Sequence, residues 1–201
     1  MTTELEIASE GKSEIVIAVI DEAYDNEDDD YEQASLLYKA SLVDEFSVEF
    51  EEGNVGPGAD IPAFITVLRE NALPLLPWLL AVFFSGKPIV DNLGAWRQIF
   101  ASVRKFFSRP VVLSRNGAAA LAVEAIFDEM GGTPRSLHLR SYRAAGIWEA
   151  DDFDKLTGLG VIEAAPPTIQ LGMVFHVFEI EADGVTMLVG VNGRDVLIRR
   201  T

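Results

Sequence analysis

The chain has 201 residues and a net charge of −16, from 32 acidic and 16 basic side chains. Charge of this sign repels nucleic acid and anionic lipid, so neither is the expected partner. Cysteine is absent, which excludes disulfides, thiol catalysis and thiolate metal sites.

The charge is unevenly distributed along the chain. Residues 1–52 hold 17 acidic residues against two lysines, whereas residues 86–143 hold nine basic residues against four acidic ones. This segregation explains why the mean hydropathy reaches +0.19 in so acidic a protein. The first residues lack the basic region and apolar segment of a signal peptide, so we expect a cytoplasmic protein.

The opening residues favour two strands followed by an acidic run. Residues 4–8 and 14–20 flank a short polar turn, and the second stretch contains an unbroken β-favouring run from Ile15 to Ile20. Such a run is typical of a strand that is buried on both faces. Residues 21–32 follow with eight acidic side chains.

A helix and a strand complete this first unit. Apolar residues over 31–46 repeat at helical spacing, and the acidic residues before them favour a helix N-terminus. Alternation within 36–42 fits a strand almost as well. Residues 46–51 alternate cleanly as a strand, which favours a helix for the stretch before them. We therefore predict an acidic β-α-β unit over residues 1–58.

Thirteen apolar residues then run without a break from Ala72 to Phe84. A transmembrane helix needs about twenty such residues. Two of the thirteen residues are prolines, and each proline removes a backbone hydrogen-bond donor from a helix. We predict two helices instead, at residues 61–72 and 77–85.

The clearest amphipathic pattern covers residues 89–107. Apolar residues recur there at spacings of 4, 3, 4, 3 and 4 and occupy one arc of a helix, while basic residues occupy the opposite arc. We predict that this helix packs on the preceding one, as a helical hairpin over residues 59–109. The candidate interaction residues lie on both arcs: Trp96, Arg97, Phe100, Arg104, Lys105 and Phe107.

Residues 110–201 form a third predicted region. A short apolar strand at 111–113, an alanine-rich helix at 116–130 and an alternating strand at 136–143 favour a right-handed crossover between parallel strands. An acidic stretch at 148–156 predicts a short helix.

The C-terminal residues predict an antiparallel meander. Strands at 173–181, 185–191 and 196–200 are separated by Asp-Gly and Asn-Gly, which favour tight hairpin turns. The expected fold is therefore α+β, with an N-terminal β-α-β unit, a central helical hairpin and a C-terminal mixed sheet that ends in a three-stranded antiparallel meander. These regions are three units or one compact domain.

The acidic run supplies candidate metal ligands. Carboxylates at alternate positions suit a hard cation, which points to Asp25, Glu27 and Asp29. The run does not complete a calcium-binding loop, because its sixth position is Asp30 instead of glycine and its twelfth is Leu36 instead of glutamate. A solvated loop with a charged helix cap is the alternative that we favour.

Two histidines are the remaining polar candidates. His138 shares a predicted strand face with Arg140 and Tyr142, and with Arg143 nearby this face is a candidate anion site, although an exposed sheet face is the favoured alternative. His176 shares its face with apolar residues, which favours a satisfied, partly buried histidine. No acid lies at triad or metal spacing from either histidine, and the G-x-S-x-G motif is absent. We identify no catalytic residue, and no cofactor is expected.

The order of elements over residues 31–108 resembles a known class of module. A helix at 31–46, the strand Ser47–Phe50, a glycine-rich turn, an apolar helix and a basic amphipathic helix are similar to small adaptor modules encoded beside bacterial conflict-system effectors. The resemblance covers less than half of the chain. It implies a non-enzymatic coupling module in a bacterium and assigns no site residue.

Two function classes follow from these observations. The leading one is a non-enzymatic interaction or scaffold module, whose hairpin offers an apolar, basic-rimmed surface to a protein partner, to another copy of the chain or to a membrane interface. Packing in the core is the favoured alternative explanation of the same apolar stripe. The second class is a small enzyme, or a protein that binds a small molecule or anion in a pocket between the hairpin and the C-terminal sheet. Nucleic-acid binding ranks last because of the net charge.

Overall fold

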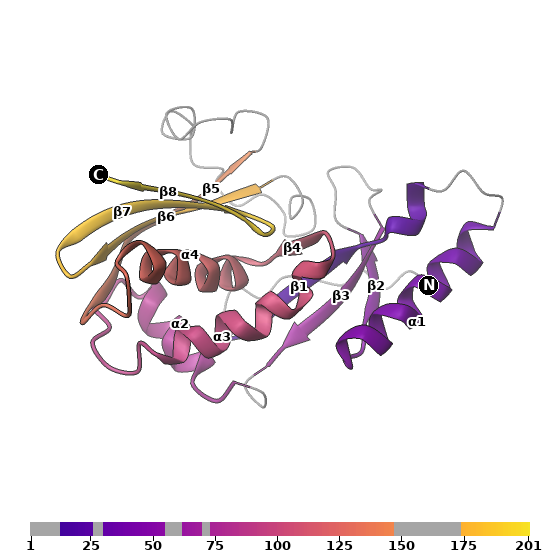
Figure 1. Ribbon diagram of the computed structural model, residues 1–201, viewed down its shortest axis with the longest axis horizontal. Helices are drawn as coiled ribbons and strands as arrows, with labels where there is room; N and C mark the ends of the chain where they lie inside the picture. Colours follow the sequence, from indigo (N-terminus) through magenta and orange to yellow (C-terminus); the bar gives the residue numbers. More distant parts are fainter. Residues whose placement is uncertain (1–12, 26–29, 55–61, 70–72, 147–173) are drawn as a thin grey trace.

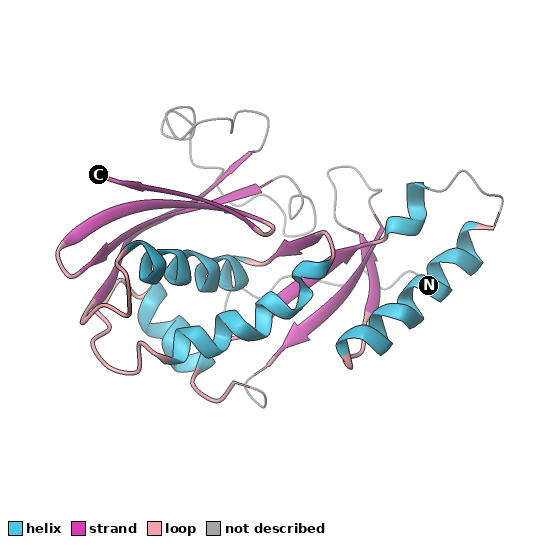
Figure 2. Ribbon diagram, viewed as in Figure 1, coloured by secondary structure: helices cyan, strands magenta, loops and turns pink. Residues whose placement is uncertain are grey.

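The computed structural model describes residues 13–25, 30–54, 62–69, 73–146 and 174–201. These residues form four α-helices and two four-stranded antiparallel sheets (Figure 1; Figure 2), which confirms the α+β class. The helices are α1 (Tyr31–Phe46), α2 (Leu76–Phe84), α3 (Ala95–Arg104) and α4 (Arg115–Glu129), with short 3-10 helices η1 (Glu22–Asp25) and η2 (Lys105–Ser108). The strands are β1 (Ile15–Ile20), β2 (Glu51–Asn54), β3 (Pro62–Leu68), β4 (Val111–Leu113), β5 (Leu137–Gly146), β6 (Val174–Ala182), β7 (Val185–Asn192) and β8 (Asp195–Arg200).

The first sheet has the strand order β2-β3-β1-β4, and we call it sheet A. Its central strand β1 is the β-favouring run predicted from the sequence. Strand β3 corrects the helix predicted at 61–72. Its residues Phe64 to Val67 are aromatic or β-branched and suit a strand, and β3 pairs antiparallel with all of β1, from Ile15 opposite Leu68 to Ile20 opposite Ala63. Within the described residues, the first helix of the central segment is therefore α2.

Helix α1 has the predicted bounds, but the β-α-β unit does not form as expected. The helix runs to Phe46 and ends at Ser47, which adopts a left-handed conformation with φ of 54°. Strand β2 starts only at Glu51, and it pairs with β3 instead of β1. The strand predicted at 46–51 is therefore displaced, because Phe46 still belongs to the helix and Ser47 ends it before the chain extends. The strand predicted at 4–8 lies outside the described residues.

Helices α2 and α3 lie within the segment predicted as a hairpin, but α3 packs mainly against α4 instead of α2. Helix α2 forms as expected, with Pro77 in its first turn, where a missing amide costs nothing. Helix α3 starts at Ala95 instead of Ile89. Both backbone groups of Ile89 are bonded to Leu137, at 2.7 and 2.9 Å, so Ile89 belongs to an isolated bridge next to β5. Asn92 has a positive φ of 58°, which also prevents an earlier helix start.

The second sheet, which we call sheet B, is the meander β5-β6-β7-β8. It corrects the mixed sheet and the parallel crossover predicted for residues 110–201. Strand β4 pairs antiparallel with β1 in sheet A, whereas β5 pairs antiparallel with β6 in sheet B. The crossover rule applies to parallel strands of one sheet, and α4 connects two different sheets. The meander has four strands where three were predicted. The helix predicted at 148–156 lies outside the described residues.

Helix α4 lies between sheet B and the pair α2 and α3 (Figure 1). Its alanines allow close packing on several sides, and nine of its residues are buried. A Cβ atom on Gly117 would lie 3.1 Å from the Ile15 side chain and 3.2 Å from that of Leu113, so glycine permits the close approach to sheet A. One continuous core cluster takes buried residues from the predicted segments 1–58, 59–109 and 110–201.

Candidate functional site

Helix α2 contains no polar or charged side chain between Leu76 and Phe84. Four of its residues, Leu76, Leu79, Leu80 and Phe83, are buried. The opposite side is exposed to solvent, with Leu75 exposed by 42% and Trp78 by 44%. Ala81 is also exposed and Val82 is half-buried. We call Leu75, Trp78, Ala81 and Val82 the α2 outer face. A helix that is apolar all round is normally buried, so this face is a candidate contact surface.

Helix α3 turns its apolar stripe toward the core. Trp96 is fully buried, its indole Nε1 has no hydrogen-bond partner, and its ring lies 5.3 Å from that of Phe83. This corrects the assignment of Trp96 to an interaction surface, because the folded chain leaves none of its surface accessible. Phe100 and Phe107 are half-buried and belong to the edge of the same core.

The predicted basic residues of this helix remain on its outer side. Arg97, Arg104 and Lys105 are exposed. Arg104 lies 6.0 Å from the centre of the Phe100 ring. The pKa of Glu124 is raised by burial, and the charges of Arg97 and Arg104 act against that rise. These cations therefore partly compensate an acid of α4 that lies beneath them, and they stay candidates for an interaction.

Arg109, the last basic residue of this stretch, has a different role. Its guanidinium group bonds Glu45 at 2.9 Å and Glu22 at 3.1 Å, which connects the end of η2 to α1 and η1. The same pairing raises the pKa of Arg109, and hydrogen bonds from Ser108 and Arg109 lower the pKa of Glu45. Arg109 thus holds the acidic helix on the body of the protein.

The residues of the predicted anion site are divided between two faces of sheet B. A bulge at Arg140 shifts the register, so that Leu139 lies opposite Ile180 while Ser141 lies opposite Glu179. Tyr142 consequently turns to the core side, away from the face on which alternation had placed it. Without the bulge, the strand would keep Tyr142 on the same side as His138.

Two polar groups of that predicted site, on Arg140 and His138, already have partners in sheet B and in the loop after α2. Arg140 pairs with Glu181 at 2.6 Å, and the His138 Nε2 donates to the Gly86 carbonyl oxygen at 2.8 Å. Arg143 lies opposite Val177 on the same strand, with its side chain partly exposed. An anion bound by His138, Arg140 and Arg143 stays a prediction, and it competes with these bonds.

His176 joins the two sheets. Its Nε2 donates to the Leu113 carbonyl oxygen of β4 at 3.2 Å, so its Nδ1 accepts the Tyr142 hydroxyl hydrogen at 3.0 Å. Burial lowers the pKa of His176 to about 4, and the Arg115 charge contributes to the lowering. The ring is neutral at physiological pH. It has a satisfied and buried position, as the sequence predicted.

The candidate metal ligands cannot be placed together. Glu27 and Asp29 lie outside the described residues, as does the side chain of Asp25. Across the parts of the chain that are described, no group of three or more His, Asp or Glu side chains is arranged to hold a metal ion. The neighbouring Asp21 is structural: its carboxylate accepts hydrogen bonds from the Tyr31 and Ser35 hydroxyls, at 3.1 and 2.7 Å.

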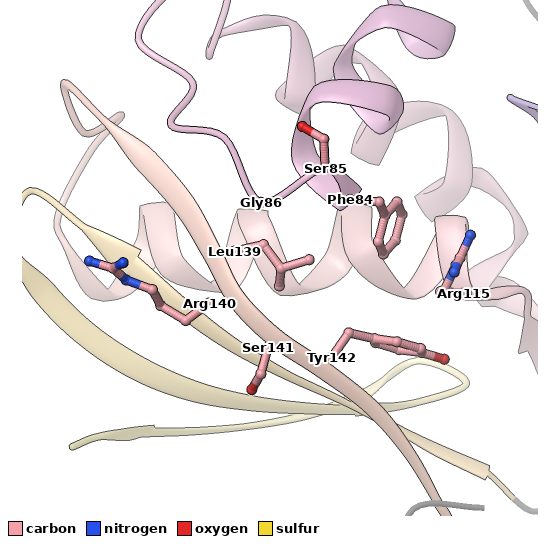
Figure 3. A pocket seen from close by; sticks show the side chains of 8 residues that line it. All are labelled: Phe84, Ser85, Gly86, Arg115, Leu139, Arg140, Ser141 and Tyr142. Atoms are coloured by element: carbon pink, nitrogen blue, oxygen red, sulfur yellow. The ribbon is translucent and has the colours of Figure 1, made fainter. Parts of the chain in front are cut away.

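A groove of about 290 Å³ lies where the end of α2, the start of α4 and strand β5 meet. Figure 3 shows the side chains of Phe84, Arg115 and Tyr142 on one side of β5. The Arg115 guanidinium carbon lies 4.3 Å from the centre of the Phe84 ring and 5.8 Å from that of Tyr142. The sequence predicted a pocket between the hairpin and the C-terminal sheet, whereas this groove also includes α4, and Phe84 and Arg115 were not among the predicted site residues. One signal was present: Arg115 is basic in the first turn of a helix, where the helix dipole disfavours a cation.

No protein-family model, curated protein or solved structure matches the chain. Among the described residues, no helix is long and apolar enough to cross a membrane. The resemblance to adaptor modules therefore stays a prediction.

Proposed function

We propose that the protein is a non-enzymatic interaction module and that it contacts a second copy of itself through the α2 outer face. The observation that carries this proposal is Trp78, a tryptophan exposed by 44% on a helix without a polar side chain. Tryptophan is enriched among the residues that contribute most to protein interfaces. A contact would remove Trp78, Leu75 and Ala81 from water, which is favourable.

A second copy suits this face because the face is uncharged. In a two-fold contact the same patch meets itself, so a charged patch would meet like charge. The acidic helix α1 lies toward the opposite end of the molecule from α2 (Figure 1). The charges of α1 in two copies that meet through α2 are thus kept apart, and salt screens them within about 8 Å at physiological ionic strength.

The face is small, so we expect weak association, with a dissociation constant on the order of 10 μM or weaker. Apolar contact between copies of equal charge also predicts that added salt strengthens association. A contact made by opposite charges would weaken with salt instead.

Sedimentation velocity over a range of concentrations tests the proposal with a matched pair of variants. Trp78→Gln removes the central side chain of the α2 outer face, and Leu37→Gln changes a leucine on α1 that is exposed by 65%. We expect the wild type and Leu37→Gln to dimerise and Trp78→Gln to stay monomeric. Dimerisation should be stronger in about 0.5 M than in about 0.1 M NaCl, because salt screens the repulsion between two copies of equal charge.

Two outcomes contradict the proposal. A wild-type chain that is monomeric up to about 0.5 mM lacks the contact, since even weak specific dimers form at that concentration. A dimer that Trp78→Gln leaves intact uses another surface. Binding of the wild type to anionic vesicles without self-association would assign the α2 outer face to a membrane surface instead.

A further inference from the structure

The groove between α2, α4 and β5 holds a cation without an acidic partner. Arg115 makes no ion pair with any carboxylate among the described residues, although the chain has twice as many acidic as basic side chains. The groove's other arginine, Arg140, is neutralised by Glu181 at 2.6 Å. Arg115 is also only partly exposed, so water does not fully solvate its charge. An anion in the groove would compensate it.

The position of the Arg115 guanidinium group is fixed by aromatic rings. It lies over the face of Phe84 at 4.3 Å, and the Phe84 and Tyr142 rings meet edge to face at 6.1 Å. Tyr142 is itself held by its hydrogen bond to His176 at 3.0 Å. A guanidinium group that stacks on a ring keeps the N–H groups at its edge available for a planar acceptor. The arrangement therefore presents a pre-oriented fork of donors.

The remaining walls select the rest of the ligand. Phe84, Leu139 and Tyr142 give the groove an apolar and aromatic wall (Figure 3). Ser85, Gly86 and Ser141 line the rest of it, and the Ser141 hydroxyl already donates to Glu179 at 2.9 Å. With Arg140 already paired, one free guanidinium group balances one negative charge. A monoanion with an apolar body matches this combination, whereas a phosphate dianion would leave one negative charge without a partner and has no apolar part to contact the wall.

We propose that this groove binds a small organic carboxylate with an aromatic or alkyl body. The carboxylate takes two hydrogen bonds from Arg115, and the body lies against Phe84, Leu139 and Tyr142. The site is separate from the α2 outer face, and neither proposal depends on the other. It also differs from the anion site predicted at His138, Arg140 and Arg143, because its charge comes from α4.

Isothermal titration with phenylacetate and 3-phenylpropionate tests the proposal on the intact chain, and the neutral amide phenylacetamide is the matched ligand. Losing the charge-assisted pair of hydrogen bonds should weaken binding by about tenfold or more. We expect phenylacetate to bind, and phenylacetamide to bind with an affinity lower by at least this factor of about ten. Arg115→Gln should lose phenylacetate to a similar degree, and Arg115→Lys should lose part of the affinity because it keeps the charge without the fork.

Arg143→Gln is the matched control, since it removes a cation from the same strand without changing the groove. It should bind phenylacetate within about twofold of the wild type, as expected for a residue outside the contact. The proposal is overturned if neither acid binds, if acid and amide bind equally, or if Arg143→Gln loses as much affinity as Arg115→Gln. If Arg115→Gln does not fold, the difference in wild-type affinity between phenylacetate and phenylacetamide still tests the proposal.

Discussion

Helices α2 and α3 are neighbours in the sequence and differ in what they expose. In α3 the apolar stripe faces the core and Trp96 is fully buried, while Arg97 and Arg104 face solvent. In α2 the side turned away from the core carries Trp78, exposed by 44%, because the helix has no polar residue to place there. One helix therefore sorts its residues between core and solvent, and the other leaves an apolar surface.

The difference shows what an amphipathic pattern does and does not reveal. When apolar residues occupy one side of a helix and polar residues the other, the apolar side is the one that faces the core. A uniformly apolar helix contains no such signal, and only the fold decides which of its side chains are covered. An exposed side of that helix is then a surface whose apolar character has no explanation within the monomer.

The largest expected effect comes from the buried member of the comparison. Trp96→Ala should destabilise the protein by about 3–5 kcal/mol, because it removes a fully buried aromatic side chain and leaves a cavity. Urea unfolding followed by circular dichroism measures the loss. A variant as stable as the wild type would show that the α3 stripe is not part of the core.

The second effect concerns His176, the residue of sheet B that bonds to strand β4 of sheet A. The pKa of His176 is about 4 in the folded chain, below its ordinary value near 6.5, so the unfolded chain binds the proton first as pH falls. His176 should therefore reduce stability progressively as pH falls from about 6.5 to about 4, by about 3 kcal/mol in total. About 2 kcal/mol of this should already be lost between pH 7 and pH 5.

Urea unfolding at pH 7 and pH 5 isolates this contribution by comparing the wild type with two variants. His176→Gln should lose the His176 part of the pH dependence, and His138→Gln, which changes the histidine bonded to Gly86, should retain it. Equal pH dependence in the wild type and His176→Gln would mean that His176 is accessible to protons in the folded chain.

A smaller effect is expected for the exposed tryptophan. Trp78→Gln should cost about 1 kcal/mol, since roughly half of the side chain contacts the protein and glutamine is well tolerated in helices. The measurement is made below the concentration at which the chain associates, so that self-association does not contribute. A loss as large as that of Trp96→Ala would place Trp78 in the core and remove the contrast between the two helices.

The smallest effect is expected on α1. Leu36 and Leu37 are exposed by 61% and 65%, so replacing either with glutamine should change stability by no more than about 0.5 kcal/mol. Thermal unfolding of each variant checks this expectation. A clear loss of stability in Leu37→Gln would disqualify it as the control for Trp78→Gln.

Local signals were sufficient for many elements of the fold. The β-favouring run predicted β1, helical spacing predicted α1, and alanine-rich composition predicted α4. The dipeptide Asp183-Gly184 predicted the turn between β6 and β7, and both residues have positive φ. Pairing between distant segments decided the rest. Residues 62–68 form a strand because β1 offers a complete antiparallel edge, and the proline at position 62 fits the start of a strand as well as the start of a helix.

The candidate sites were predicted less well, for related reasons. Alternation along β5 could not reveal the bulge at Arg140, and that single residue moved Tyr142 to the core side next to Arg115. The basic arc of α3 was recognised because charge is visible in the sequence. The sequence favoured core packing for the apolar stripe of α3, but the pattern alone did not exclude an interface, and Trp96 was therefore also a candidate contact residue.

Hydroxyl-radical footprinting as a function of protein concentration tests the central claim most directly, because it reports on both tryptophans in one sample. We expect Trp96 to be unlabelled at every concentration, and Trp78 to be labelled in dilute samples and progressively protected as concentration rises, with the exposed Leu37 unchanged. Labelling of Trp78 that does not depend on concentration would contradict a contact through α2, and labelling of Trp96 would contradict the packing of α3.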